Sequence, residues 1–174
     1  MSGEQRSRWP LAILVVAFLM PFASAVVLRF GGWQTGHTRN FGDLLNPPVT
    51  MEGVTASDGK GEAWSFVNQE QEWTLLVSSA NPCDAGCEAT LAALPNVRRS
   101  MGRHAGRLHV YHLGESVDSD MPTLQLSGAP PELDARPPSG TEVWLVDPHG
   151  FLVMHYPSGF DPSGLRKDLS RLIR

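Results

Sequence analysis

The chain has 174 residues, enough for one compact domain and a short additional segment. Hydrophobic residues make up 41% and charged residues 18%, a composition typical of folded rather than disordered proteins. With 14 Lys and Arg against 18 Asp and Glu, the formal net charge is −4. These totals exclude the basic excess that nucleic-acid binding usually requires, so we expect no nucleic-acid partner.

An uncharged apolar run occupies the beginning of the chain, over Trp9–Leu28. At about 1.5 Å per residue, its length matches a hydrocarbon core of roughly 30 Å. Arginines before it favour a cytoplasmic N-terminus, so we expect residues 1–8 to be a short cytoplasmic segment and 9–29 a transmembrane anchor. Residues 23–25, Ala-Ser-Ala, also fit the cleavage site of a signal peptide. In both cases the remainder of the chain is exported.

The next segment, residues 30–50, is rich in Gly and Pro and is predicted to be a juxtamembrane linker. We expect the folded domain to occupy residues 51–174. Within it, the apolar run Trp73–Ser78 predicts a strand buried on both faces, as in the centre of a helix-covered sheet.

A helix and a second strand follow. The composition from Asp84 to about Arg103 predicts a helix, with a break or kink near Leu94 because Pro95 follows. Residues 107–113 alternate enough to predict a strand. A strand, helix, strand order of this length implies a right-handed parallel crossover.

The rest of the domain is predicted to contain a loop, a hairpin and a final helix. Residues 114–140 are interpreted as a loop with at most a short helix. Residues 141–146 and 151–156 flank an Asp-Pro-His-Gly turn and form an antiparallel hairpin. A helix then begins at Asp161-Pro162. Its predicted apolar face is Leu165, Leu169, Leu172 and Ile173, and its basic residues are interpreted as a solvated face: Arg166, Lys167, Arg171 and Arg174.

This order predicts an α/β domain with a thioredoxin-like mixed sheet: parallel strands at one side, an antiparallel hairpin at the other, and helices on both faces. One transmembrane helix precedes it.

The two cysteines, Cys83 and Cys87, follow the predicted central strand directly and begin the predicted helix. Residues four apart on a helix share one face, so the two sulfurs suit either a disulfide or a shared soft metal ion. A helix N-terminus lowers the pKa of a thiol, and we expect Cys83 to be the attacking thiol and Cys87 the resolving one.

A structural disulfide is the competing interpretation of this pair. A bridge that closes so short a loop removes little entropy from the unfolded chain, which favours redox or metal chemistry instead. The spacing is not the Cys-x-x-Cys of thioredoxin-type oxidoreductases. A thiol peroxidase is less favoured, because Ala80 stands where those families usually carry a Thr.

An apolar membrane segment, the Cys83-x-x-x-Cys87 pair after an apolar strand, and a late strand, Asp-Pro-x-Gly, strand unit together resemble the Sco (SenC) family of cytochrome oxidase assembly proteins. The resemblance covers roughly residues 50–174. It implies a thioredoxin-like fold and copper binding by Cys83 and Cys87 with a distant His. The position of that His is Ser139 here. Among the other histidines, His112 is the best geometric candidate for a copper ligand, because its strand should end at the same sheet edge as Cys83.

The function predicted from these features is assistance to cytochrome c oxidase assembly, by thiol–disulfide exchange and possible copper handling through Cys83 and Cys87. The expected partners are the membrane and cytochrome c oxidase subunits or their assembly factors. The expected location is the bacterial inner membrane, with a single span and the C-terminal domain in the periplasm. The alternative is a non-catalytic assembly or scaffolding module with a vestigial disulfide.

Overall fold

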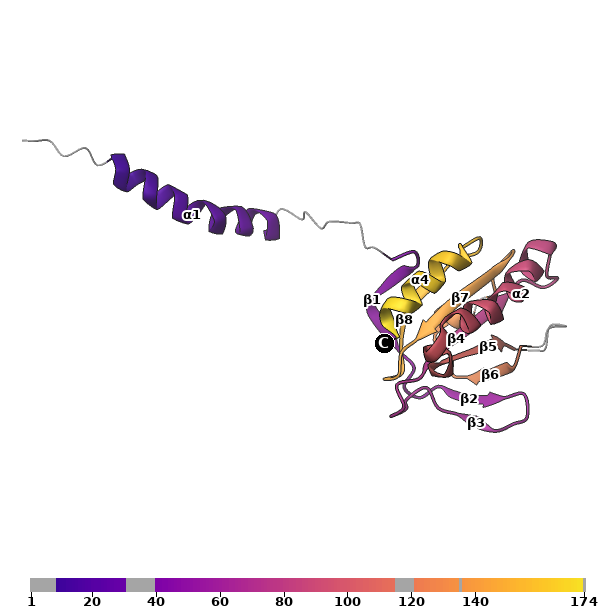
Figure 1. Cartoon of the computed structure of the whole chain (residues 1–174). Coiled ribbons are helices and arrows are strands. Elements are labelled where there is room, and N and C mark those ends of the chain that lie inside the picture. The colour runs from indigo at the N-terminus through magenta and orange to yellow at the C-terminus, as the bar shows by residue number, and fades with distance from the viewer. Residues whose placement is uncertain (1–8, 31–39, 115–120, 135, 174) are drawn as a thin grey trace, which may run out of the picture. The chain divides into compact units, whose positions relative to one another are not determined.

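The computed structural model describes residues 9–30, 40–114, 121–134 and 136–173. The chain divides into two compact units, Met1–Arg39 and Asn40–Arg174. In the first unit, residues Trp9–Phe30 form helix α1, which continues through Pro21 (Figure 1). Within the described residues, no helix meets the length and hydropathy needed to cross a membrane.

The second unit contains a mixed sheet whose eight described strands run in the order β1-β8-β7-β4-β5-β6-β2-β3. The strands are β1 (Asp43–Thr50), β2 (Thr55–Asp58), β3 (Ala63–Trp64), β4 (Trp73–Ser79), β5 (Leu108–Leu113), β6 (Thr123–Ser127), β7 (Thr141–Val146) and β8 (Phe151–Tyr156). The described helices of this unit are α2 (Ala85–Ser100), the 3-10 helix η1 (Gly102–Arg107), α3 (Pro131–Asp134) and α4 (Pro162–Leu172).

The predicted centre of the sheet is confirmed. Strand β4 is buried from Thr74 onwards, and it pairs in parallel with β5 and antiparallel with β7. The hairpin of β7 and β8 is confirmed as well, with Trp144 opposite His155. Its turn is closed by Asp147, whose carboxylate accepts hydrogen bonds from the N–H groups of His149 and Phe151.

Four described strands lie where the sequence predicted none: the short β2 and β3 near the start of the predicted domain, and β1 and β6 in segments predicted to be a linker and a loop. Residues 43–50, within the predicted linker, form β1, an edge strand antiparallel to β8. Pro47 and Pro48 are tolerated there because an edge strand needs few of its N–H groups, and the register shifts between Leu44 and Val49. Within the predicted loop 114–140, residues 123–127 form β6, which pairs in parallel with β5.

The predicted break near Leu94 is also wrong, because α2 continues through Pro95 to Ser100. Its buried side chains lie on both sides of the proline, at Leu91, Leu94 and Val97. Burial of this apolar stripe offsets the backbone hydrogen bond that Pro95 cannot make.

Helices α2 and α4 lie side by side over one face of the sheet (Figure 1). In α4, Leu165 and Leu169 are buried as predicted, and so is the C-cap residue Ile173. Leu172 is 41% exposed and does not belong to the apolar face. The opposite face of the sheet carries a second apolar cluster, to which α3 contributes Leu133. The predicted mixed sheet with flanking helices is therefore correct.

Candidate functional site

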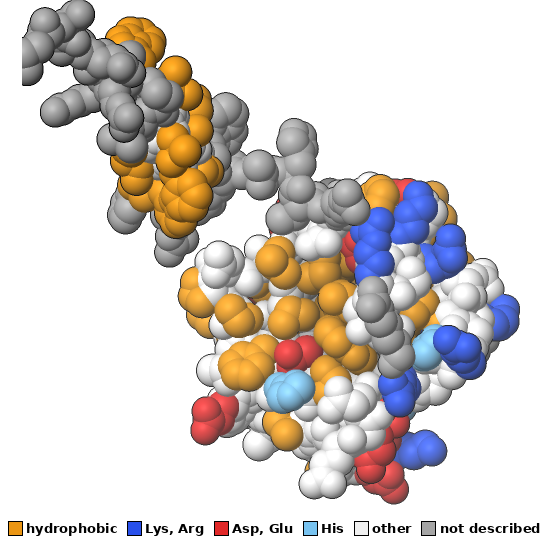
Figure 2. Space-filling view, turned by 60° about the vertical axis from the view of Figure 1, so that its left-hand side comes forward, with side chains coloured by type: hydrophobic (Ala, Val, Ile, Leu, Met, Phe, Trp, Pro, Cys, Tyr) orange, Lys and Arg blue, Asp and Glu red, His pale blue; other side chains and the backbone are white. Residues whose placement is uncertain are grey.

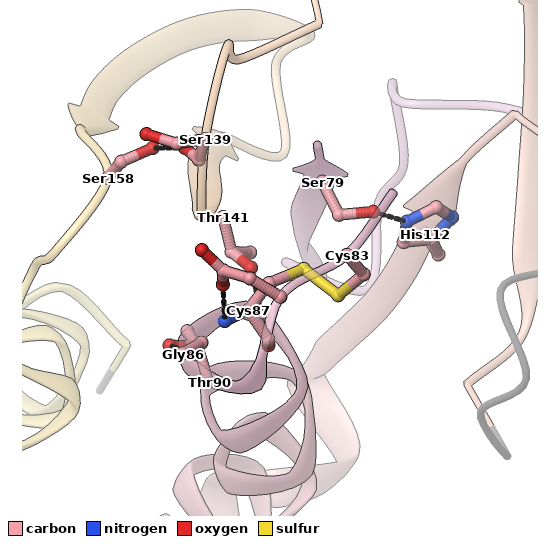
Figure 3. Close-up of a disulfide and its surroundings, with 10 residues drawn as sticks. Ser79, Cys83, Gly86, Cys87, Thr90, His112, Ser139, Thr141 and Ser158 are labelled. Atoms are coloured by element: carbon pink, nitrogen blue, oxygen red, sulfur yellow. Dashed lines mark hydrogen bonds between the residues drawn. A yellow bond between two sulfur atoms is a disulfide. The ribbon is translucent and has the colours of Figure 1, made fainter. Parts of the chain in front are cut away.

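The two cysteines are joined by a disulfide at the carboxyl end of β4, where the chain turns into α2 (Figure 3). Cys83 lies in the connecting loop, and Cys87 lies in the first turn of the helix, with the two Cα atoms 5.4 Å apart. The bonding of the pair agrees with the spacing argument from the sequence.

The two sulfur-bearing residues differ in exposure. Cys87 is fully buried in the apolar cluster between α2, α4 and the sheet. Cys83 is only partly buried and packs against the edge of the same cluster. Cys83 is therefore the more accessible of the two residues.

Asp84 fixes the beginning of α2 beside the disulfide. It is the N-cap residue, and its carboxylate accepts a hydrogen bond of 2.8 Å from the N–H of Cys87. This bond uses one of the N–H groups that a helix leaves unpaired at its N-terminus. Because the carboxylate is negative, it also competes with a thiolate for the positive end of the helix dipole.

Three buried polar side chains lie at the ends of neighbouring strands on the α2 face of the sheet. The Oγ of Ser79 in β4 and the Nε2 of His112 in β5 are 2.7 Å apart, and both residues are 4% exposed (Figure 3). In β7, the hydroxyl of Thr141 donates to the backbone oxygen of Cys87 at 3.5 Å. The hydroxyl and imidazole groups can accept a proton from a cysteine thiol, although the surroundings of Cys87 are largely apolar.

Sequence reasoning singled out His112 but missed Ser79 and Thr141. Strand alternation could have found Ser79, because it lies two residues after Val77 and so on the same face of β4. Thr141 has no such signal, since its role depends on the pairing of β7 with β4.

The residues around the disulfide do not fit a copper ion in this oxidised form. Disulfide sulfurs are not the thiolates that cuprous copper prefers, and His112 already contacts Ser79. Ser139, at the position of the expected third ligand, is exposed, and its backbone oxygen accepts a hydrogen bond from the Ser158 hydroxyl at 2.7 Å (Figure 3). In the described part of the chain, no three His, Cys, Asp or Glu side chains are grouped as metal ligands.

Comparison with solved structures finds proteins of low sequence identity. A copper-bound ScoI of Arabidopsis thaliana has 16% identity and a TM-score of 0.47, covering 73% of this chain and 96% of its own. A copper-bound ScoI of Bradyrhizobium japonicum has 18% identity and a TM-score of 0.44, covering 72% and 97%. A putative electron transfer protein of Aquifex aeolicus VF5 has 15% identity and a TM-score of 0.49, also covering 72% and 97%. No curated protein matches the sequence.

A family model gives the assignment. The model described as "Transmembrane-like, thioredoxin-like, C-terminal domain" matches residues 73–174, a range that begins with β4 and includes the disulfide, α2, the β7–β8 hairpin and α4. The match covers more than half of the chain and confirms the thioredoxin-like fold expected from the sequence. The chain therefore belongs to the family of transmembrane-like, thioredoxin-like C-terminal domains.

Proposed function

We propose that this protein carries out thiol–disulfide exchange through Cys83 and Cys87. The observation that carries the proposal is the unequal exposure of a disulfide at the first turn of α2, with Cys83 partly accessible and Cys87 fully buried. In this arrangement Cys83 forms the mixed disulfide with the partner, and Cys87 resolves it.

The reaction starts from the reduced pair. The Cys83 thiolate attacks one sulfur of a partner disulfide, forming a mixed disulfide and releasing the partner's other sulfur as a thiolate. Cys87 then loses its proton and attacks the Cys83 sulfur, which releases the partner's second thiolate. The partner disulfide gains two electrons and two protons, and the protein ends in the disulfide form seen in the structure. The reverse sequence oxidises a partner dithiol.

The structural alternative explains less of the site. By the chain-entropy relation, a bridge closing this short loop stabilises the fold by about 2 kcal/mol, less than a bridge closing a long loop. Local hydrogen bonds already hold the same turn, since Asp84 caps α2 independently of the sulfurs.

We further propose that α1 attaches the domain to the bacterial inner membrane as a single span, with the thioredoxin-like domain in the periplasm. The uncharged apolar sequence from Trp9 to Leu28 supports this, as does the description of the matching family as transmembrane-like. The proposed partners are cytochrome c oxidase subunits or their assembly factors, a proposal supported by the sequence resemblance to the Sco family.

Copper handling would require reduction of the disulfide and a donor beyond the two thiolates. It is tested separately, by titrating the anaerobically reduced protein with Cu(I) against a competing chelator. A Cys83→Ser, Cys87→Ser variant is the control. One-to-one binding that is lost in this variant would support a copper cargo.

The exchange proposal is tested by trapping the intermediate. A Cys87→Ser variant should accumulate a mixed disulfide with a disulfide-bonded peptide, whereas Cys83→Ser should accumulate far less, because Cys87 is buried. Mass spectrometry identifies the adduct. Equal trapping by both variants would contradict the assigned order. If neither variant is trapped, and oxidase assembly in cells survives loss of both cysteines, the non-catalytic scaffolding module is the better description.

A further inference from the structure

Basic side chains gather on one part of the folded unit, although Asp and Glu outnumber Lys and Arg in the chain. They lie at the end of α2, in η1 and along α4, elements that the packing of α4 against α2 brings together. Figure 2 shows Lys and Arg side chains along the right-hand side of this unit, and apolar side chains over the centre of the same view. We call this the basic surface, and it consists of Arg98, Arg99, Arg103, Arg166, Lys167 and Arg171.

The sequence interpretation, a solvated face of the last helix alone, considered only half of this surface. The residues of α2 and η1 are about sixty positions away from those of α4 along the chain, so only the tertiary structure joins the two runs.

A groove runs through the basic surface between the end of α2 and α4. It has a volume of about 310 Å³ and is lined by Arg103 of η1, Arg166 of α4 and the buried side chains of Met101 and Ile173. The Nε of Arg103 donates a hydrogen bond to the Nε2 of His104 at 2.8 Å. The Nε2 of this imidazole is therefore an acceptor and does not itself bind an anion. In the described part of the chain, no carboxylate lies within ion-pair distance of Arg103 or Arg166.

The chain joins the folded unit on the helix that carries half of the basic surface. The N–H groups of Phe41 and Gly42 donate to the carboxylate of Asp168 in α4, at 2.7 and 3.2 Å. The ammonium group of Lys167 lies 5.0 Å from the centre of the Phe41 ring. Only residues 31–40 separate this point from the end of α1, and ten residues span at most roughly 35 Å.

We propose that the basic surface binds the phosphate headgroups of an anionic membrane and turns α4 and η1 towards that membrane. The proposal rests on the membrane attachment by α1 proposed above, because the short connection keeps the basic surface within reach of the headgroups. Lys and Arg side chains near an anionic leaflet are attracted to it within a Debye length. The acidic remainder of the domain is repelled, so charge asymmetry fixes the orientation.

This orientation has a consequence for the disulfide. The groove lies at the C-terminal end of α2 and the disulfide at its N-terminal end. A helix of 16 residues is about 24 Å long. The disulfide is therefore held well away from the headgroups, where it meets the exported domain of a membrane-bound partner.

The test uses the full chain in lipid nanodiscs containing a gadolinium-chelating lipid, which broadens amide NMR signals near the surface. We expect signals of α4 and η1 to lose about twofold more intensity in discs containing phosphatidylglycerol than in phosphatidylcholine discs, and the difference to vanish in high salt. An Arg103→Glu, Arg166→Glu variant should lose the difference. The matched control, Lys60→Glu with Arg136→Glu, makes the same charge change outside the basic surface and should keep it.

Each other outcome overturns a defined part of the argument. Equal broadening in both kinds of disc, or an unchanged effect in the double variant, overturns headgroup binding while leaving the anchor and the disulfide chemistry intact. Preferential binding of a polyglutamate peptide over phosphatidylglycerol would reassign the surface to an acidic protein. If the chain leaves the discs in high salt, α1 is not a membrane anchor. Headgroup binding is then tested with vesicles in low salt. Cosedimentation of the chain with phosphatidylglycerol vesicles but not with phosphatidylcholine vesicles would support it, and equal cosedimentation would overturn it.

Discussion

Two buried polar clusters lie on the face of the sheet that α2 and α4 cover, and they differ in what they contribute to the protein. At one, the carboxylate of Asp168 accepts hydrogen bonds from backbone N–H groups at the start of the unit and from the Tyr156 hydroxyl, and pairs with Arg171. At the other, Ser79 contacts His112 beside the disulfide. The first cluster joins segments more than 120 residues apart in the sequence. The second joins β4 and β5, which already pair with each other in the sheet. The comparison indicates that the Asp168 carboxylate stabilises the fold, whereas the Ser79–His112 pair lies next to the proposed reactive disulfide.

The sharpest test of the first cluster is Asp168→Ala. The substitution leaves two backbone N–H groups and the Tyr156 hydroxyl without their acceptor in a buried site. We expect the free energy of unfolding to fall by about 3 kcal/mol or more, measured by urea denaturation. Asp168→Asn, which keeps an acceptor oxygen, should lose less. Equal losses in the two variants would show that the side chain contributes by packing and not by accepting hydrogen bonds.

The next largest effect on stability is expected at Gly42, where the start of the folded unit lies close to the core, and Gly164 serves as its matched control. A Cβ at Gly42 would lie 2.5 Å from the ring of Tyr156, which is fully buried and has no room to move. A Cβ at Gly164 would lie 2.6 Å from the ring of Phe41, which is 52% exposed and can turn aside.

We therefore expect Gly42→Ala to destabilise the protein by about 2 kcal/mol. Gly164→Ala should cost much less, because alanine also favours the helix. Thermal unfolding of the two variants measures the difference, and a greater loss at Gly164 would contradict the assumed rigidity of Tyr156.

Alkaline pH tests the same cluster by titration. Burial raises the pKa of Tyr156 well above its ordinary value of about 10, and the charge of Asp168 and its hydrogen bond add to the shift. The unfolded chain loses the proton near pH 10 while the folded chain keeps it. Stability is therefore complete below pH 10 and falls as the pH rises above it, by about 1.4 kcal/mol for each pH unit.

Tyr156→Phe should remove most of this decline. The chain contains only one other tyrosine, Tyr111, whose pKa is raised mainly by burial, so Tyr111→Phe is the matched control and should keep most of the decline. Urea denaturation at pH 8 to 11 measures it. If the two variants decline equally, Tyr156 is not the group that resists ionisation.

The two clusters also show how far the sequence predicts this molecule. Strand β4 and the turn at Asp147 were predictable because the apolar run and the Asp-Pro-x-Gly pattern act locally. Strands β1 and β6 were not, because β1 contains two prolines that suggest a linker, and each strand is held by pairing with a segment, β8 or β5, that the local pattern does not reveal.

The candidate site divides in the same way. The spacing of Cys83 and Cys87 and their position after an apolar strand placed the disulfide, and strand order placed His112 at the same edge. The contact with Ser79 was missed because the predicted strand ended at Ser78, although strand alternation places Ser79 on the same face as Val77. Asp168 was missed because a single Asp in a basic helix suggests only a surface charge.

The smallest change in stability, and the most informative for the disulfide, is expected from neighbouring serines in β4. Ser78 and Ser79 are both buried, but they lie on opposite faces of the strand, and only Ser79 contacts His112. Each substitution to alanine should cost about 1 kcal/mol of unfolding free energy. In Ser79→Ala the imidazole Nε2 loses the Ser79 hydroxyl, and we expect it to accept a hydrogen bond from a thiol of the reduced pair, which stabilises the dithiol form. Its reduction potential should therefore rise by about 20 mV in glutathione buffers, while that of Ser78→Ala stays unchanged. Equal potentials in the two variants would show that the Ser79–His112 contact, like the Asp168 cluster, only holds the fold.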